Sequence, residues 1–292
     1  MISIVDAALN GLLIGIFFAL MAAGFSMVWA GMRIVNVAHA ALIVLAGYLA
    51  FTITRVLPLD IFTMVVIIGP LMFVVGVILY RFVISYAYLA DSFETVSIVA
   101  TFGLAIVIEN ITLWQFGPDY VAYSSSYAGR IELWEFTIPQ LNLLAAGITL
   151  AALTGLYWLL YRTKTGRAVR ASWQDESLAV LHGIDLERTR AIIFGVSVAL
   201  AGVAGVLLPA MLTIQPGIHW RYIIIVFLIV VIGGIGNLIG TVIAGMLVGV
   251  IYGAAPLFMS NAWVPVILYL LLIGVLLFKP TGLFKSSVKG VK

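Results

Sequence analysis

Residues 222–278 read YIIIVFLIVVIGGIGNLIGTVIAGMLVGVIYGAAPLFMSNAWVPVILYLLLIGVLLF and contain no charged side chain. A membrane-spanning helix needs about 20 apolar residues, so this stretch of 57 residues is too long for one helix. It is interrupted by GGIGN at 233–237 and again between Pro256 and Asn261. The pattern predicts segments at 222–233, 238–255 and 263–278. The first would cover only about 18 Å, which predicts a broken or re-entrant helix near 222–255, with GGIGN inside the bundle.

The rest of the chain is also rich in apolar residues and poor in charged ones. Of its 292 residues 64% are hydrophobic and 9% charged, whereas a soluble domain is about half apolar and about a quarter charged. We therefore expect an all-α, polytopic transmembrane helical bundle of about eight segments, with seven and nine as alternatives, forming a single transmembrane domain over 1–292. The first span is expected to be retained, because no basic region precedes it. The other uncharged stretches are 7–32, 34–54, 61–80, 95–108, 136–161 and 191–220.

Several kinds of chemistry are disfavoured. The chain has no cysteine, and its three histidines lack metal-ligand spacing. It contains no G-x-x-x-x-G-K-[ST] phosphate-binding loop and no G-x-S-x-G nucleophile motif. We expect no catalytic residue, no metal and no cofactor in this chain. Because the basic residues sit at the ends of apolar segments, the lipid bilayer is the expected partner and nucleic acid is not.

Lysine and arginine predict the orientation, since cytoplasmic loops collect them. With the N-terminus outside and the C-terminus inside, only Arg55, Arg130 and Arg221 of the 15 basic residues face outward. The reverse topology would invert this split, so we expect the N-terminus outside. The predicted cytoplasmic set comprises Arg33, Arg81, Arg162, Lys164, Arg167, Arg170, Arg188, Arg190, Lys279, Lys285, Lys289 and Lys292.

The predicted inner loop, 162–190, reads RTKTGRAVRASWQDESLAVLHGIDLERTR. Its spacing indicates short amphipathic helices that end at Gly183, with one side formed by small and aliphatic residues such as Leu178 and Leu181. The side chains expected to face outward are Arg167, Arg170, Asp175 and Glu176. Without further detail an ordinary solvated loop would be the simpler interpretation.

The motif T-x-x-G-R-A-x-R-A from Thr163, followed by L-x-G-I-D from Leu181, resembles the cytoplasmic loop of permeases in branched-chain amino acid importers of the ATP-binding-cassette type. Three more stretches resemble that family in the same order: R-I-V-N-V-A-H at 33–39, G-G-I-G-N-x-x-G at 233–240 and K-P-T-G-L-F at 279–284. The form with Asn36 and His39 is closest to the family's shorter permease type. Ala40, Trp173, Asn237 and Lys285 depart from its usual residues.

The resemblance implies a subunit that moves branched-chain or related hydrophobic amino acids across the cytoplasmic membrane of a bacterium or archaeon. It implies a second homologous permease, two ATPase subunits that bind ATP and magnesium, and an extracytoplasmic solute-binding protein. Urea, short amides or small carboxylates are alternative substrates. In the family this loop contacts the ATPase. The coupling residues implied here are Gly166, Arg167, Arg170, Gln174, Asp175, Glu176 and Gly183.

Polar residues and glycines inside apolar segments form the second candidate site. Polar groups at membrane depth usually face the bundle interior, although hydrogen bonding between helices is the commoner role for an isolated histidine. Glu109 either faces the bundle or, as we favour, lies near the outer end of its helix. Glycine pairs such as Gly245 and Gly249 predict close helix packing. The candidate translocation pathway comprises Asn36, His39, Gly233, Gly234, Gly236 and Asn237.

Two other classes of function stay open at this point. A stand-alone secondary transporter would need coupled ionisable residues within the bundle, and only Glu109 and His39 are available. A membrane-embedded enzyme would need clustered catalytic groups near one interface, which the sequence does not display.

Overall fold

The computed structural model describes residues 4–57, 59–122, 127, 129–133, 136–279 and 282–284. Over this part of the chain, nine helical segments are long and apolar enough to cross a membrane. Nine lies within the predicted range, and the all-α bundle is confirmed. The long helices are α1 (Ile4–Met32), α2 (His39–Val56), α3 (Ile61–Leu79), α5 (Phe93–Phe116), α6 (Gln140–Arg162), α9 (Leu186–Met211), α10 (His219–Gly233), α11 (Leu238–Ala254) and α12 (Val264–Phe278).

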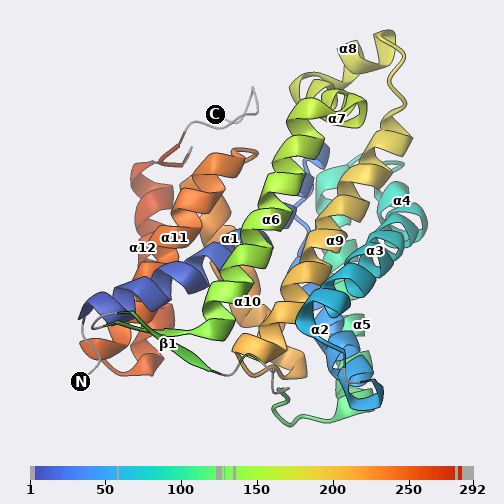
Figure 1. The fold of residues 1–292 in the computed structure, drawn as a ribbon. Coiled ribbons are helices and arrows are strands. Elements are labelled where there is room, and N and C mark those ends of the chain that lie inside the picture. Colours follow the sequence, from blue (N-terminus) through green and yellow to red (C-terminus); the bar gives the residue numbers. More distant parts are fainter. Residues whose placement is uncertain are drawn as a thin grey trace.

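Short elements cap the two ends of the bundle (Figure 1). A hairpin of strands β1 (Arg130–Leu133) and β2 (Phe136–Pro139) lies near the N-terminus and adds a small sheet to the expected all-α architecture. Helices α7 (Lys164–Gln174) and α8 (Glu176–Leu181) project from the opposite end. A π-helical turn, Tyr80–Ile84, and the short α4 (Ser85–Ala87) extend α3, while 3₁₀ turns cover Pro216–Ile218, Ala255–Leu257 and Asn261–Trp263.

Both predicted breaks in 222–278 are confirmed. Helix α10 ends at Gly233, and α11 begins at Leu238 after a turn in which Gly234 and Gly236 have φ of 81° and 75°. Glycine adopts such positive φ values without steric cost. The expected 12-residue segment is longer than predicted, because helical structure begins at Pro216 and makes an 18-residue span. The pair therefore forms two antiparallel spans joined by a tight turn.

Helix α1 is the centre of the fold, with 83% of its most apolar window buried. It packs closely on α11 through glycines. A Cβ added at Gly249 would lie 2.2 Å from Gly15 Cα, and one added at Gly245 would lie 2.8 Å from Gly15 O. The predicted packing role of Gly245 and Gly249 is confirmed. Their partners on α1 are Gly11 and Gly15, which were not predicted from the sequence.

Another break, outside 222–278, separates α1 from α2. After Met32 the chain turns at Arg33, which has φ of 55°, and α2 begins at His39 beside the middle of α1. An interior start for α2 leaves residues 33–38 as non-helical backbone inside the protein, where Ile34, Asn36 and Ala38 are fully buried. Such backbone at membrane depth is tolerated only where protein or water surrounds it.

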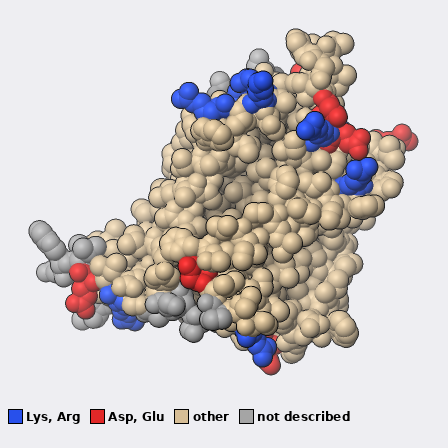
Figure 2. Space-filling model, turned by 45° about the vertical axis from the view of Figure 1, so that its right-hand side comes forward, with Lys and Arg blue, Asp and Glu red and all other residues tan. Residues whose placement is uncertain are grey.

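On the face drawn in Figure 2, charged side chains lie mostly at the two ends of the molecule, and a broad band between them is nearly uncharged. Arg221 at the start of α10 donates to the Tyr252 hydroxyl at the end of α11, 2.9 Å away, which places both at the same end. The band has the form expected of a lipid-facing surface. Of the predicted cytoplasmic set, Lys285, Lys289 and Lys292 lie outside the described residues.

Candidate functional site: two helix breaks and a platform

His39 is fully buried and connects three helices. Its Nε2 lies 2.9 Å from the Met21 carbonyl of α1, and its Nδ1 lies 3.4 Å from the Ser197 hydroxyl of α9. The carbonyl can only accept a hydrogen bond, so Nε2 carries the hydrogen and Nδ1 accepts from Ser197. A Cβ added at Gly24 would lie 2.9 Å from the imidazole, which leaves no free space on that side. The expected role in hydrogen bonding between helices is confirmed.

Asn36 differs from His39 in having an unsatisfied side chain. The residue is fully buried, and neither amide atom has a hydrogen-bond partner within the described part of the chain. Nearby backbone is satisfied instead: the Asn36 carbonyl accepts from His39 N, and Thr101 Oγ1 of α5 accepts from Val37 N at 3.2 Å. Leaving a buried polar group unpaired costs about 1–3 kcal/mol. Asn36 therefore presents a donor and an acceptor that the fold itself does not use.

The GGIGN turn is held by contacts from distant segments. Gly236 N donates to Ser26 Oγ of α1 at 3.1 Å, and the Asn237 side chain accepts from Gly240 N at 2.9 Å, which caps α11. Leu283 N donates to Ile232 O, so part of the K-P-T-G-L-F motif closes over the turn. Gly236 is one of the candidate pathway residues, but its N–H is already used by this contact within the chain. The cavity beside Gly236 is only about 10 Å³, room for at most one water molecule.

Helix α1 brings the two breaks together, since Met21 contacts His39 and Ser26 contacts Gly236. Aromatic rings that the sequence analysis did not single out lie beside them. Trp29 and Phe227 stack with centroids 5.3 Å apart, and Phe25 lies 6.0 Å from the His39 ring. They come from α1 and α10, which are far apart in sequence, so no local spacing could have revealed the cluster. Gly233 packs against Gly240 and Thr241 and serves helix contact.

Glu109 has partners that the sequence did not predict. Its Oε2 accepts from Trp220 Nε1 at 3.1 Å and lies 3.8 Å from His219 Nε2. Its side chain is 26% exposed, and both partners belong to the first turn of α10. Because α10 begins at the same end as the β hairpin (Figure 1), Glu109 lies toward the predicted outer end of the bundle, the placement that we favoured.

Helices α7 and α8 together form a platform at one end of the bundle, and capping residues and glycines determine its shape. Thr163 accepts from Gly166 N at 3.0 Å, and Asp175 accepts from Leu178 N at 3.0 Å, so the two side chains begin α7 and α8. A Cβ at Gly166 would lie 2.1 Å from Leu159 O, which shows how tightly α7 folds against the end of α6. Gly183, with φ of 76°, follows α8 and lets the chain turn into α9.

A groove of about 480 Å³ lies between α7 and α8 on the exposed surface of the platform. Arg167 and Asp175 are exposed along it, as expected, and Gln174 is exposed beside them. Two expectations were wrong in detail. Leu178 and Leu181 are 55% and 80% exposed rather than turned inward. Arg170 and Glu176 are half-buried: Arg170 Nη1 donates to Leu160 O, and Glu176 pairs with Arg190, so both serve contacts within the chain.

A chain of contacts leads from the platform to α1, and we call Glu176, Arg190, Tyr88 and Met32 the relay. Arg190 Nη2 lies 2.6 Å from Glu176 Oε2, and its guanidinium lies 3.9 Å from the centroid of the Tyr88 ring. Tyr88 donates to Met32 O at 2.9 Å, and burial raises the pKa of its hydroxyl, which keeps the donor protonated. The relay ends four residues before Asn36.

Trp173 provides a second contact between the platform and α1. It is buried, and a Cβ added at Gly31 would lie 2.3 Å from its Nε1. In the sequence Trp173 departs from the family pattern, because a large residue is unusual at this position of the loop. In the structure its ring fills the space that the missing side chain of Gly31 leaves. The platform therefore touches the last turn of α1 directly through Trp173 and reaches it indirectly through the relay.

These features define a class: a multi-pass membrane protein with buried non-helical backbone between α1 and α2, connected through side-chain contacts to a platform at one end. Within the described residues, no group of histidine, aspartate or glutamate side chains could hold a metal ion. The family model for the permease component of the branched-chain amino acid transport system matches residues 7–276, and the chain belongs to this family.

Curated relatives agree over nearly the whole chain. The high-affinity branched-chain amino acid transport system permease protein LivH of Escherichia coli K12 is 29% identical over 286 residues, covering 94% of this chain and 93% of the relative. BraD of Pseudomonas aeruginosa is 28% identical with the same coverage. A probable LivH of the archaeon Methanocaldococcus jannaschii is 29% identical, covering 94% and 90%. No solved structure matches the chain significantly.

Proposed function

We propose that this chain is one permease subunit of an ATP-driven importer that carries branched-chain amino acids across the cytoplasmic membrane, with the N-terminus outside and the C-terminus inside. Its partners would be a second homologous permease, two ATPase subunits that hold ATP and magnesium, and an extracytoplasmic solute-binding protein. The observation that carries the proposal is the direct contact between a projecting helical platform and the end of α1, which leads into an interior helix break. The names of the relatives support the substrate class.

The groove between α7 and α8 is the surface we assign to the ATPase. It offers Arg167 and Asp175 as opposite charges and Leu178 as an exposed apolar side chain. A partner docked there can push on α7, whose Trp173 abuts Gly31, and on α8, whose Glu176 holds Arg190. Either movement reaches the last turn of α1. Nucleotide binding would thus move residues 33–38 and change access to Asn36.

The proposed substrate fits the chemistry near the break between α1 and α2, at residues 33–38. Asn36 provides a donor and an acceptor, and Phe25, Trp29 and Phe227 provide apolar surface close by. An amino acid with a branched aliphatic side chain needs both kinds of contact. Urea and short amides would use the polar group alone. Because the solute-binding protein supplies most of the affinity, a weak site here is sufficient.

The test is purification of the chain from its native membrane in mild detergent, followed by reconstitution into vesicles and measurement of ATP hydrolysis and leucine uptake. We expect an ATPase and a second permease to accompany the chain. Charge reversal by Asp175→Lys with Glu176→Lys should abolish both activities. Glu94→Lys is the matched control, because Glu94 is an exposed carboxylate at the same end but outside the platform. A lone chain that moves leucine without ATP would instead establish a secondary transporter.

A further inference from the structure

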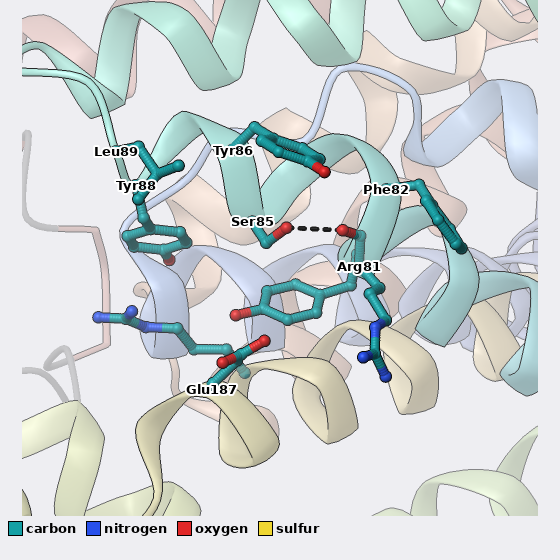
Figure 3. Close-up of a pocket in the computed structure, with 9 residues that line it drawn as sticks. Arg81, Phe82, Ser85, Tyr86, Tyr88, Leu89 and Glu187 are labelled. Atoms are coloured by element: carbon teal, nitrogen blue, oxygen red, sulfur yellow. Dashed lines mark hydrogen bonds between the residues drawn. The ribbon is translucent and has the colours of Figure 1, made fainter.

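A pocket of about 430 Å³ lies beside the platform end of α3 and belongs to neither helix break (Figure 3). The π-helical turn Tyr80–Ile84, helix α4 and the first turn of α9 form its walls. A π-helical turn widens a helix locally and often marks a functional site. The lining residues include Arg81, Phe82, Tyr86, Tyr88, Glu187 and Arg190.

The pocket sits at the boundary between apolar and charged surface. It lies where the apolar span Ile61–Ala87 ends. Phe82, Tyr86 and Leu89 are 67%, 62% and 81% exposed, so large apolar surfaces adjoin the pocket without protein covering them. Tyrosines are enriched at the level of lipid headgroups, because the ring is apolar and the hydroxyl is polar. This end of α3 therefore has the composition of a membrane interface.

Two charges in the pocket are not paired. Among the residues that the structure describes, no ion pair involves Arg81 or Glu187, whereas Arg190 is held by Glu176 and by the Tyr88 ring. Figure 3 shows Arg81 and Glu187 on one side of the pocket and Tyr86 and Leu89 on the opposite side. Ser85 Oγ donates to the backbone carbonyl of Arg81 at 2.7 Å, a contact within the helix that does not involve the guanidinium.

We propose that this pocket binds a membrane phospholipid with a zwitterionic phosphoethanolamine headgroup. The phosphate pairs with the Arg81 guanidinium, whose planar fork suits phosphate oxygens. The ammonium pairs with the Glu187 carboxylate, and the acyl chains follow the exposed side of Phe82 along the apolar span. A purely anionic headgroup would satisfy Arg81 but leave its negative charge facing Glu187. The bound lipid would touch Tyr88 and Arg190, the two central members of the relay.

The leaflet follows the orientation in the proposed function, but the binding test does not depend on transport. The full-length chain, with the subunits that accompany it in mild detergent, is equilibrated with equal amounts of palmitoyl-oleoyl phosphatidylethanolamine and phosphatidylglycerol. Retained lipids are then counted by native mass spectrometry. We expect Arg81→Gln to lower retention of phosphatidylethanolamine roughly tenfold, as befits loss of a charge-assisted contact. Glu187→Gln should remove the preference for phosphatidylethanolamine over phosphatidylglycerol.

Arg162→Gln and Glu94→Gln are matched controls, because both residues are exposed at the same end but do not line the pocket. Arg81→Lys keeps the charge and should retain the lipid better than Arg81→Gln, which separates binding from misfolding. The proposal is wrong if the pocket variants retain the same lipids as wild type, or if the control variants lose them equally. Displacement of the lipid by millimolar leucine would overturn it in favour of an amino-acid site.

Discussion

The relay makes the sharpest quantitative prediction, and the change that tests it is Arg190→Lys. Lysine keeps the positive charge but loses the planar guanidinium that lies 3.9 Å from the Tyr88 ring centroid. A partly desolvated cation–π contact contributes about 1–2 kcal/mol. The ion pair with Glu176 adds about 1 kcal/mol or less, because Glu176 is a third exposed. We expect Arg190→Lys to lower the free energy of unfolding by about 1–2 kcal/mol and to reduce the leucine moved per ATP hydrolysed.

The assay combines denaturant unfolding in detergent with transport by the reconstituted complex. If Arg190 acts through Tyr88, Arg190→Lys and Tyr88→Leu each remove the same contact, and the double variant loses less than the sum by at least about 0.5 kcal/mol. Arg221→Lys is the control, since Arg221 also lies over a tyrosine, Tyr252, but at the opposite end. Additive losses, or an equal fall in coupling for Arg221→Lys, would refute the relay.

Three further changes test the interior of the bundle. Asn36→Leu replaces an unpaired buried amide by an apolar side chain of similar size, so we expect the free energy of unfolding to rise by about 1 kcal/mol or more while leucine uptake falls. A lower free energy of unfolding would show that the amide is satisfied in the folded protein. Gly249→Leu would force α1 from α11 and should abolish assembly, whereas Gly274→Leu, with nothing within 4 Å of the added Cβ, should be tolerated; equal yields of folded protein from the two variants would contradict the glycine packing. Gly166→Ala should uncouple ATP hydrolysis from uptake by displacing α7, and Gly155→Ala, which meets open space, is its control; normal coupling in Gly166→Ala would contradict the tight fit of α7 on α6.

The helix breaks could be predicted because glycine and proline act locally. The turn at Gly234 and Gly236 and the break after Pro256 lie where the sequence placed them. The start of α10 was placed too late, because Arg221 was taken as the boundary of an apolar segment. Its first turn instead carries His219 and Trp220, whose polar atoms face Glu109 of α5. Such partners are set by tertiary packing, so no residue spacing in the sequence indicates them.

The candidate site was predictable in position but not in its contacts. His39 was identified from its apolar surroundings, yet its partner Ser197 is 158 residues away. Trp173 and Arg190 lie in the loop that the motif analysis singled out, but their roles depend on Gly31 and Tyr88. Arg170 and Glu176 were expected to face outward because charged side chains usually do. In the folded chain Arg170 donates to Leu160 O and Glu176 pairs with Arg190, and amphipathic periodicity predicts neither contact.

The central claim is that the platform is where an ATPase docks, and crosslinking tests it most directly. The chain has no cysteine, so one introduced thiol is unique in it. Leu181 is 80% exposed on α8, and Trp114, at 85%, lies at the opposite end of the molecule. A photoreactive maleimide on Leu181→Cys should capture the ATPase subunit in the purified complex, and the same reagent on Trp114→Cys should not. No adduct from Leu181→Cys, or the same adduct from both positions, would contradict the account.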